Sequence, residues 1–276
     1  MLNLALGAAF AGPLYTPSPW PSLTQATALQ ARSAGCNWCS IPVWYGAPIE
    51  QLVQLVKLAM MGGLYVIVVP HCDGLGSDAD SLMPFLGFGQ YRAWFAALCA
   101  ALRGLPVAIE LWNEAEYTAD QAERYGLGWP SMSALYVSAS QLVSLARNAG
   151  LHVICPLPLD QSPEQTAQLI QAGAFPISEI GSLGVDGVSA HIYEVPGSEH
   201  IGRIRTVSDV AADLGVQLLV TETNAGVDAW RITAWEKTYR MLALPRIYWQ
   251  WVSAPPAPSD FSAPAVLAAI KQAATA

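Results

Sequence analysis

The sequence is poor in charge and has no basic cluster. Aspartate, glutamate, lysine and arginine make up 12% of its 276 residues, and the formal net charge at pH 7 is −8. Soluble domains contain roughly 25% charged residues, so this chain is unusually apolar. A negative protein without runs of Lys or Arg repels polyanions, and we therefore expect no nucleic-acid partner.

Long hydrophobic runs are also absent. The longest apolar stretch, 58–70, has 13 residues, contains Gly62-Gly63 and ends at Pro70. A membrane-spanning helix needs about 20 apolar residues, so we expect no membrane partner. The first residues, 1–13, include an apolar stretch but have no Lys or Arg before it. That composition favours a buried first strand over a signal peptide and leaves the localisation open.

Motifs for phosphates and metals are missing too. No Gly-x-Gly-x-x-Gly follows the first apolar run, and no Gly-x-x-x-x-Gly-Lys occurs anywhere, which argues against a nucleotide cofactor. Of the five cysteines, Cys36 and Cys39 form the single Cys-x-x-Cys pair. A lone pair, even with His71-Cys72 elsewhere, is a weak metal signature, and buried free thiols are the better interpretation. We expect no cofactor and no metal.

What the chain does contain is a regular alternation of two patterns. Short runs rich in Val and Ile predict strands, and the stretches between them have apolar residues at helical spacing. The strand runs are continuously apolar, as in parallel strands covered on both faces. The predicted strands are 2–10, 37–45, 64–71, 107–114, 151–159, 187–193, 217–223 and 246–252, and the predicted helices are 22–35, 48–63, 90–104, 131–150, 162–175, 201–215, 229–244 and 262–276.

Eight strand–helix units without a linker predict one α/β domain, residues 1–276, folded as a (β/α)8 TIM barrel. A doubly wound open sheet is the alternative, and the missing dinucleotide motif counts against it. In a TIM barrel the active site is built at the carboxyl ends of the strands. From the polar and aromatic residues at the predicted strand ends, the candidate site residues are Trp44, His71, Asn113, Glu114, His191, Tyr193, Glu222, Trp249 and Trp251.

Two of these residues, Glu114 and Glu222, are carboxylates at strand ends that share one rim. A carboxylate pair without a metal is what glycoside hydrolysis uses: one group protonates the leaving oxygen and the other attacks the anomeric carbon. Ten tryptophans in the chain offer platforms for sugar rings. The pattern therefore predicts a carbohydrate substrate.

The order of these motifs resembles glycoside hydrolase clan A, the retaining (β/α)8 glycosidases that include families 5 and 39. The resemblance covers nearly the whole chain and implies that Glu114 is the general acid/base and Glu222 the nucleophile. It also implies an earlier, structural carboxylate, matched by Glu110, which we expect inside the barrel with a partner. We expect substrate contacts from the remaining strand-end residues: Asn113 at the sugar 2-hydroxyl, Tyr193 (which would also orient Glu222), His71, His191, Trp44, Trp249 and Trp251.

Two departures from the clan's pattern bear on activity. The usual Arg of strand two, which hydrogen-bonds the nucleophile, is replaced by Ser40, and the Pro that commonly follows Asn-Glu is Ala115. Loss of a cation beside Glu222 would let the pKa of that carboxyl rise. The leading hypothesis is a monomeric retaining glycosidase acting on a polysaccharide or oligosaccharide. A carbohydrate-binding barrel that has lost catalysis and a metal-dependent barrel hydrolase are the alternatives.

Overall fold

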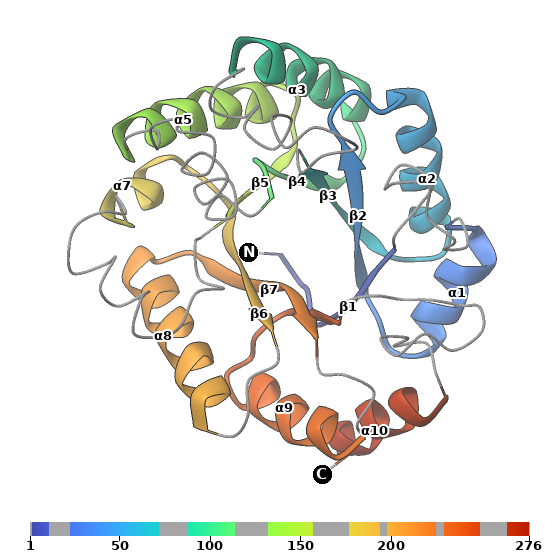
Figure 1. Ribbon diagram of the computed structural model, residues 1–276. Coiled ribbons are helices and arrows are strands. Elements are labelled where there is room, and N and C mark those ends of the chain that lie inside the picture. The colour runs from blue at the N-terminus through green and yellow to red at the C-terminus, as the bar shows by residue number, and fades with distance from the viewer. Residues whose placement is uncertain are drawn as a thin grey trace, which may run out of the picture.

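In the computed structural model, eight parallel strands close into a barrel, and helices surround it (Figure 1). The strands pair in chain order, and the last pairs with the first. This closure excludes the open sheet and confirms the predicted TIM barrel. The structure describes residues 2–10, 23–71, 88–113, 132–156, 177–193, 198–224, 229–248 and 264–275.

Each predicted strand is present, but several are shorter than predicted. Only β6 has the predicted bounds. Residues 2–5 precede β1 without belonging to it, and residues 111–113 leave the sheet after β4. The strands are β1 (Leu6–Ala9), β2 (Trp38–Trp44), β3 (Tyr65–His71), β4 (Val107–Glu110), β5 (His152–Pro156), β6 (Gly187–Tyr193), β7 (Gln217–Asn224) and β8 (Arg246–Tyr248).

The helices follow from apolar spacing and from capping residues. In α2 the buried residues are Leu52, Leu55, Val56 and Ala59, which form one stripe along the helix. The predicted helix at 162–175 lies outside the described residues, and the sequence did not predict α7. The helices are α1 (Gln25–Ser33), α2 (Ile49–Met61), α3 (Phe88–Leu102), α5 (Met132–Asn148), α7 (Ile177–Ser182), α8 (Ser198–Leu214), α9 (Ala229–Met241) and α10 (Pro264–Thr275).

Two glycines follow the last residue of α2. Gly62 is the C-cap of the helix and has right-handed helical geometry, with φ −76°. The left-handed residue is the next one, Gly63, with φ +80°. A positive φ favours glycine because it has no Cβ, so Gly63 provides the left-handed residue that commonly follows a helix C-cap.

Two hydrophobic cores hold the barrel. The larger one lies between the strands and the helices and includes Cys39, Val68 and Ile109. The smaller one fills the barrel interior, and its buried members are Leu2, Ala9, Trp38, Ile67, Val69, Ala108, Ile154 and Leu219. Successive strand residues alternate between these two cores, as the period of two requires.

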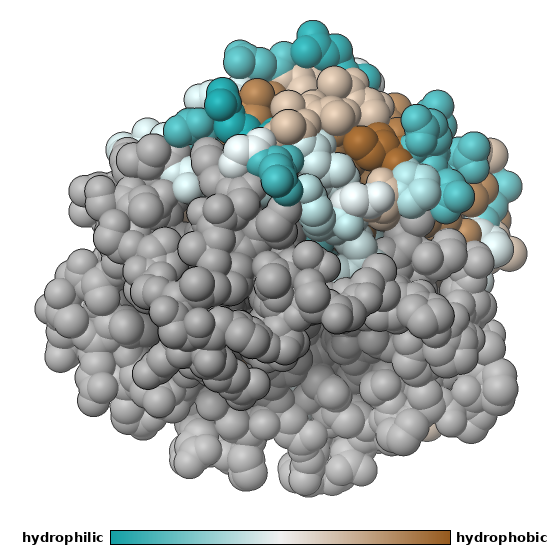
Figure 2. Space-filling model, turned by 45° about the horizontal axis from the view of Figure 1, so that its top comes forward, coloured by the Kyte–Doolittle hydropathy of each residue, from teal (hydrophilic) through white to brown (hydrophobic). Residues whose placement is uncertain are grey.

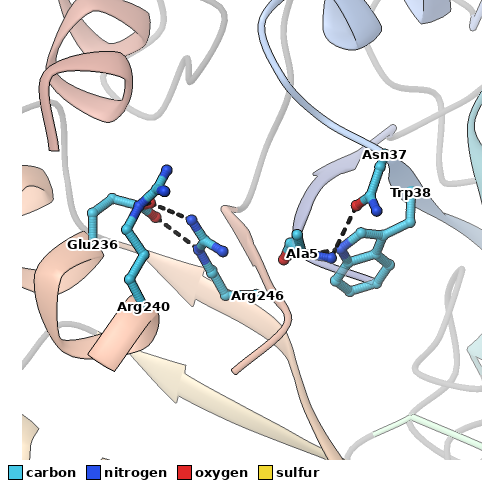
Figure 3. A network of polar contacts seen from close by, with 6 residues as sticks. All are labelled: Ala5, Asn37, Trp38, Glu236, Arg240 and Arg246. Atoms are coloured by element: carbon cyan, nitrogen blue, oxygen red, sulfur yellow. Dashed lines mark hydrogen bonds and ion pairs between the residues drawn. The ribbon is translucent and has the colours of Figure 1, made fainter. Parts of the chain in front are cut away.

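The base of the barrel is closed by residues at or just before the starts of the strands. The side chain of Gln217 accepts a hydrogen bond from the Leu2 N–H and donates one to the Leu2 carbonyl, both at 3.0 Å. The Asn37 side chain similarly accepts from the Ala5 N–H at 2.9 Å, as Figure 3 shows. Residues 2–5 are therefore fixed across the base although they form no strand.

The outer surface is mixed. On the face shown in Figure 2, brown and tan residues form small areas bordered by teal ones. The large exposed apolar side chains are Leu29, Met61, Ile201 and Met241, each on a different helix. Within the described ranges, no helix is long and apolar enough to cross a membrane.

Candidate active site

Six buried polar residues line the barrel interior. Each lies on a strand, and the alternation of side chains directs it inward: His71 and Thr221 follow the inner-core residues Val69 and Leu219 by two positions, and the other four lie between residues of the outer core. Such groups are uncommon in a barrel core, which is usually filled by branched apolar side chains. They are Ser40, His71, Glu110, Ser189, His191 and Thr221.

Trp44 and His71 meet at the ends of β2 and β3. They are partners in the register of these strands. Their rings contact each other edge to face with centroids 5.7 Å apart, and both side chains are buried. Two residues predicted to bind substrate from different strands are thus in contact.

The end of β4 is a corner rather than a continued strand. Glu110, the last strand residue, is paired with Ile154 of the inner core and is 1% exposed. This confirms its predicted place inside the barrel. Burial raises the pKa of the neighbouring Cys155 thiol to about 12, and the Glu110 carboxylate contributes to that rise. A second negative charge in this region is therefore disfavoured.

The residues after Glu110 include one of the predicted substrate ligands. The Asn113 side-chain oxygen is buried and makes no hydrogen bond within the described part of the chain. Trp112, beside it, is also buried. The predicted acid/base, Glu114, is the next residue and lies outside the described ranges, as do Trp249 and Trp251.

The register of β7 changes beside Glu222. Ala190 pairs with Val220, but His191 pairs with Glu222, so β7 contains one extra residue at this point. The pairing with β8 shifts over the same residues, between Val220 and Thr223. A bulge shared with both neighbours redirects the strand locally, and such bulges are over-represented next to active sites. Tyr193, two residues on, pairs with Asn224.

Ser189 and Thr221 are interior residues that were not among the predicted site residues. Both hydroxyls are buried and make no hydrogen bond within the described residues. Native proteins leave few buried polar groups unpaired, and each exception needs an explanation. A period-two count from Leu219 on β7 would have placed Thr221 inside, and the same count back from His191 on β6 would have placed Ser189 there.

The described interior residues include no arginine that could take the place of the clan's strand-two Arg, whose position is occupied by Ser40. Ser40 is buried, and its register partners are Ala9 and Ile67. Arg246, a buried arginine on β8, faces α9 instead and donates to Glu236, with a 2.9 Å contact from Nε to Oε1. Figure 3 shows Arg240 on the same carboxylate. The basic groups facing the described interior are His71 and His191.

Four of the five cysteines are free and buried, as predicted: Cys36, Cys39, Cys99 and Cys155. The metal set considered from the sequence combined Cys36 and Cys39 with His71 and Cys72. Cys39 belongs to the outer core, whereas His71 faces the interior, so the sheet lies between these two side chains. The described residues contain no group of three or more metal-binding side chains. Cys72 lies outside the described ranges.

Comparison with known proteins found solved structures with a similar barrel. No sequence family and no curated protein matches the chain. A family 5 xyloglucanase from Paenibacillus pabuli matches with a TM-score of 0.70 and 14% identity over 98% of both chains. A family 5 glycoside hydrolase from Prevotella bryantii B14 matches with a TM-score of 0.71 and 16% identity, over 98% of this chain and 96% of that one.

A family 5 xyloglucanase from Bacteroides ovatus gives a TM-score of 0.69 and 15% identity over 99% of this chain and 75% of that one. The fold is that of the family 5 glycoside hydrolases. The structural match to these barrels extends over nearly the whole chain, as the resemblance to clan A implied. A shared fold does not fix an activity, which has to be argued from the site.

Proposed function

We propose that this chain is a retaining glycoside hydrolase, with residues 1–276 acting as a single catalytic domain without a cofactor. The observation that carries the proposal is the extra residue in β7, which aligns Glu222 with the inward-facing His191. It is supported by the family 5 fold and by the buried polar groups that gather in the barrel interior.

In the proposed reaction Glu222 is the nucleophile and Glu114 the general acid/base. The Glu222 carboxylate attacks the anomeric carbon while Glu114 gives its proton to the departing glycosidic oxygen. Water then attacks the glycosyl-enzyme ester, Glu114 takes a proton from that water, and Glu222 leaves as a carboxylate. The anomeric configuration is retained because it is inverted twice.

The other predicted residues hold the sugar and the carboxylates. Asn113 binds the 2-hydroxyl through the amide, whose oxygen has no hydrogen bond within the described residues. Tyr193 orients Glu222. The remaining substrate contacts come from His71, His191, Trp44, Trp249 and Trp251.

The proposed substrate class is a polysaccharide with a β-1,4-glucan backbone. Solved structures with this fold include xyloglucanases and endo-β-1,4-glucanases. Reducing-sugar release from xyloglucan, carboxymethylcellulose, mannan, xylan and galactan tests the class. Wild type should act on one of the first two polymers.

Variants test the two carboxylates. Removal of a general acid lowers rates by about 10²–10⁴-fold, so we expect a loss of this size in Glu114→Gln. Glu222→Gln should not turn over. Glu50→Gln, which changes an exposed carboxylate on α2, is the matched control and should keep full activity. A 2-deoxy-2-fluoro glycoside should label Glu222, and a label on any other residue contradicts the assignment.

The replacement of the strand-two Arg by Ser40 favours a second candidate, a sugar-binding barrel without catalysis. The described interior offers no arginine to hold the nucleophile, so Glu222 would be poorly oriented and less readily ionised. Binding of a polymer without any hydrolysis, unchanged in Glu114→Gln and Glu222→Gln, would establish this function in place of the first.

A further inference from the structure

The corner after β4 begins at the point where β5 offers no further backbone N–H as a hydrogen-bond donor. Leu111 still donates its N–H to the Ile154 carbonyl of β5, at 3.1 Å. In a parallel ladder the Leu111 carbonyl would then accept from the residue two positions after Ile154. That residue is Pro156, which has no N–H to donate. The ladder between β4 and β5 therefore ends at Leu111 for a chemical reason.

A tyrosine on α3 supplies the missing hydrogen bond. The Tyr91 hydroxyl donates to the Leu111 carbonyl at 2.5 Å, and Tyr91 is fully buried. Its ring stacks on Tyr45, with centroids 6.4 Å apart, and packs against Phe95 at 5.9 Å. The phenol is thus held by aromatic neighbours at the point where a backbone amide would otherwise stand.

The consequence of this bond falls on the residues that follow. Leu111 is two residues before Asn113 and three before Glu114. Without a partner for its carbonyl, the chain would be free to rotate about the backbone bonds that follow the Leu111 N–H, which is the last group held by β5. A displacement of about 1 Å in a catalytic group can slow a reaction by about 10²-fold, so the direction of this corner matters for chemistry.

We propose that Tyr91 is a positioning residue for the β4 corner, in which its hydroxyl replaces the ladder N–H that Pro156 lacks. The proposal rests on the proposed function for its catalytic meaning, because Glu114 follows the corner. Tyr91 does not touch the substrate. It fixes the backbone from which Asn113 and Glu114 extend.

The first test measures the corner itself and needs no activity. Backbone hydrogen exchange at Leu111, Trp112 and Asn113 is compared between wild type and Tyr91→Phe, which removes only the hydroxyl. One net hydrogen bond corresponds to about 5-fold in an opening equilibrium, so we expect exchange at Leu111 to rise by about that factor. In Tyr91→Phe/Pro156→Ala the new backbone N–H should restore slow exchange.

The second test measures acid catalysis. Phenyl β-cellobioside needs a proton on its leaving oxygen, whereas 2,4-dinitrophenyl β-cellobioside leaves without one. In Tyr91→Phe we expect kcat/KM for the phenyl substrate to fall by about 10-fold and that for the dinitrophenyl substrate to change by less than about 2-fold. The double variant should recover the phenyl substrate.

Two single variants are the controls. Pro156→Ala should behave as wild type in both tests, because Tyr91 still occupies the carbonyl. Tyr239→Phe removes another buried tyrosine hydroxyl, on α9, and should alter neither the exchange at Leu111 nor the ratio between the two substrates.

The outcomes separate this proposal from the proposed function. Unchanged exchange in Tyr91→Phe overturns the positioning role, whatever the activity. Equal losses on both substrates, or no recovery in the double variant, reduce Tyr91 to a packing residue and overturn it too. A wild type that hydrolyses no glycoside contradicts the proposed function, while the exchange pattern and its rescue still decide whether Tyr91 holds the corner.

Discussion

Two parts of the barrel interior are built in opposite ways. At the base, between β1 and β2, the Trp38 side chain is completely buried and its indole N–H donates to the Ala5 carbonyl at 3.3 Å. On the wall formed by β6 and β7, the hydroxyls of Ser189 and Thr221 are buried just as deeply and make no hydrogen bond within the described residues. The Trp38 side chain at the base is closely packed and hydrogen-bonded, whereas the wall contains buried hydroxyls without a hydrogen bond in the described residues.

This difference separates stability from function along the barrel. Because the strand starts are closely packed, the strand ends can carry groups that reduce stability. An unpaired buried hydroxyl, for example, costs about 1–3 kcal/mol. In TIM barrels the two ends of the strands divide these tasks. Substitutions at the base should therefore change stability without changing catalysis, and substitutions on the wall should do the reverse.

The largest expected effect is at the base, in Gly7→Ala. A Cβ on Gly7 would lie 2.5 Å from the Trp38 indole, which is completely buried. Overpacking of this kind costs about 1–3 kcal/mol of unfolding free energy, measured by urea denaturation. Activity per folded molecule should stay at the wild-type level.

Gly89→Ala is the matched control for the base. A Cβ at Gly89, in α3, would contact nothing within 4 Å, and this glycine does not have a positive φ. Alanine is the better helix former, so stability should rise by about 0.5–1 kcal/mol. Equal destabilisation by both substitutions would show that the fit of Trp38 against Gly7 is not what limits the base.

A smaller effect of opposite sign is expected on the wall, in Thr221→Val. The substitution keeps the shape and removes an unpaired hydroxyl, so the unfolding free energy should stay level or rise by about 1 kcal/mol. If the hydroxyl serves the site beside Glu222, kcat/KM should fall by about 5-fold, the value of one net hydrogen bond. A stability loss with intact activity would erase the contrast between the two regions.

The smallest effect concerns a charged contact beside the base, at the start of β6. Partial burial by itself would raise the pKa of Asp186, but the Val153 N–H at 2.7 Å, His152 and Arg147 outweigh it and lower that pKa below 3.8. A lowered pKa in the folded state stabilises the protein above the unfolded value of about 3.9, and this stabilisation is lost as the pH falls through the folded value.

Asp186→Asn should therefore lower the unfolding free energy at pH 7 by up to about 1 kcal/mol, because the pair with Arg147 is partly exposed. The difference from wild type should shrink as the pH falls below about 4, which urea titrations at several pH values would follow. Asp209→Asn, at an exposed position on α8, is the control. A difference that persists in acid would point to a loss of shape rather than of charge.

The strand order could be read from the sequence because each strand is a local apolar run between turn residues. β6 was predicted with its observed bounds, 187–193. β4 was predicted too long because its end depends on Pro156, a residue of another strand that no local pattern connects to Leu111. The β7 bulge escaped for the same reason, since it is defined by pairing with both neighbours.

The candidate site was predictable to the extent that it sits at strand ends. Trp44, His71 and His191 are on their predicted strands and are buried. Asn113 follows β4 as expected, although on a corner. Glu114, Trp249 and Trp251 lie outside the described residues and stay predictions, as do the roles of Glu222 and Tyr193.

The hydrogen bonds between Gln217 and Leu2 have a practical consequence for handling the protein. They fix the start of the described chain beneath the barrel, at the end of the strands opposite the proposed sugar site. A linker or surface tether attached ahead of Leu2 would then leave from the base. A protein immobilised in this way would present the opposite mouth of the barrel to an insoluble polymer. A soluble substrate would not depend on this orientation.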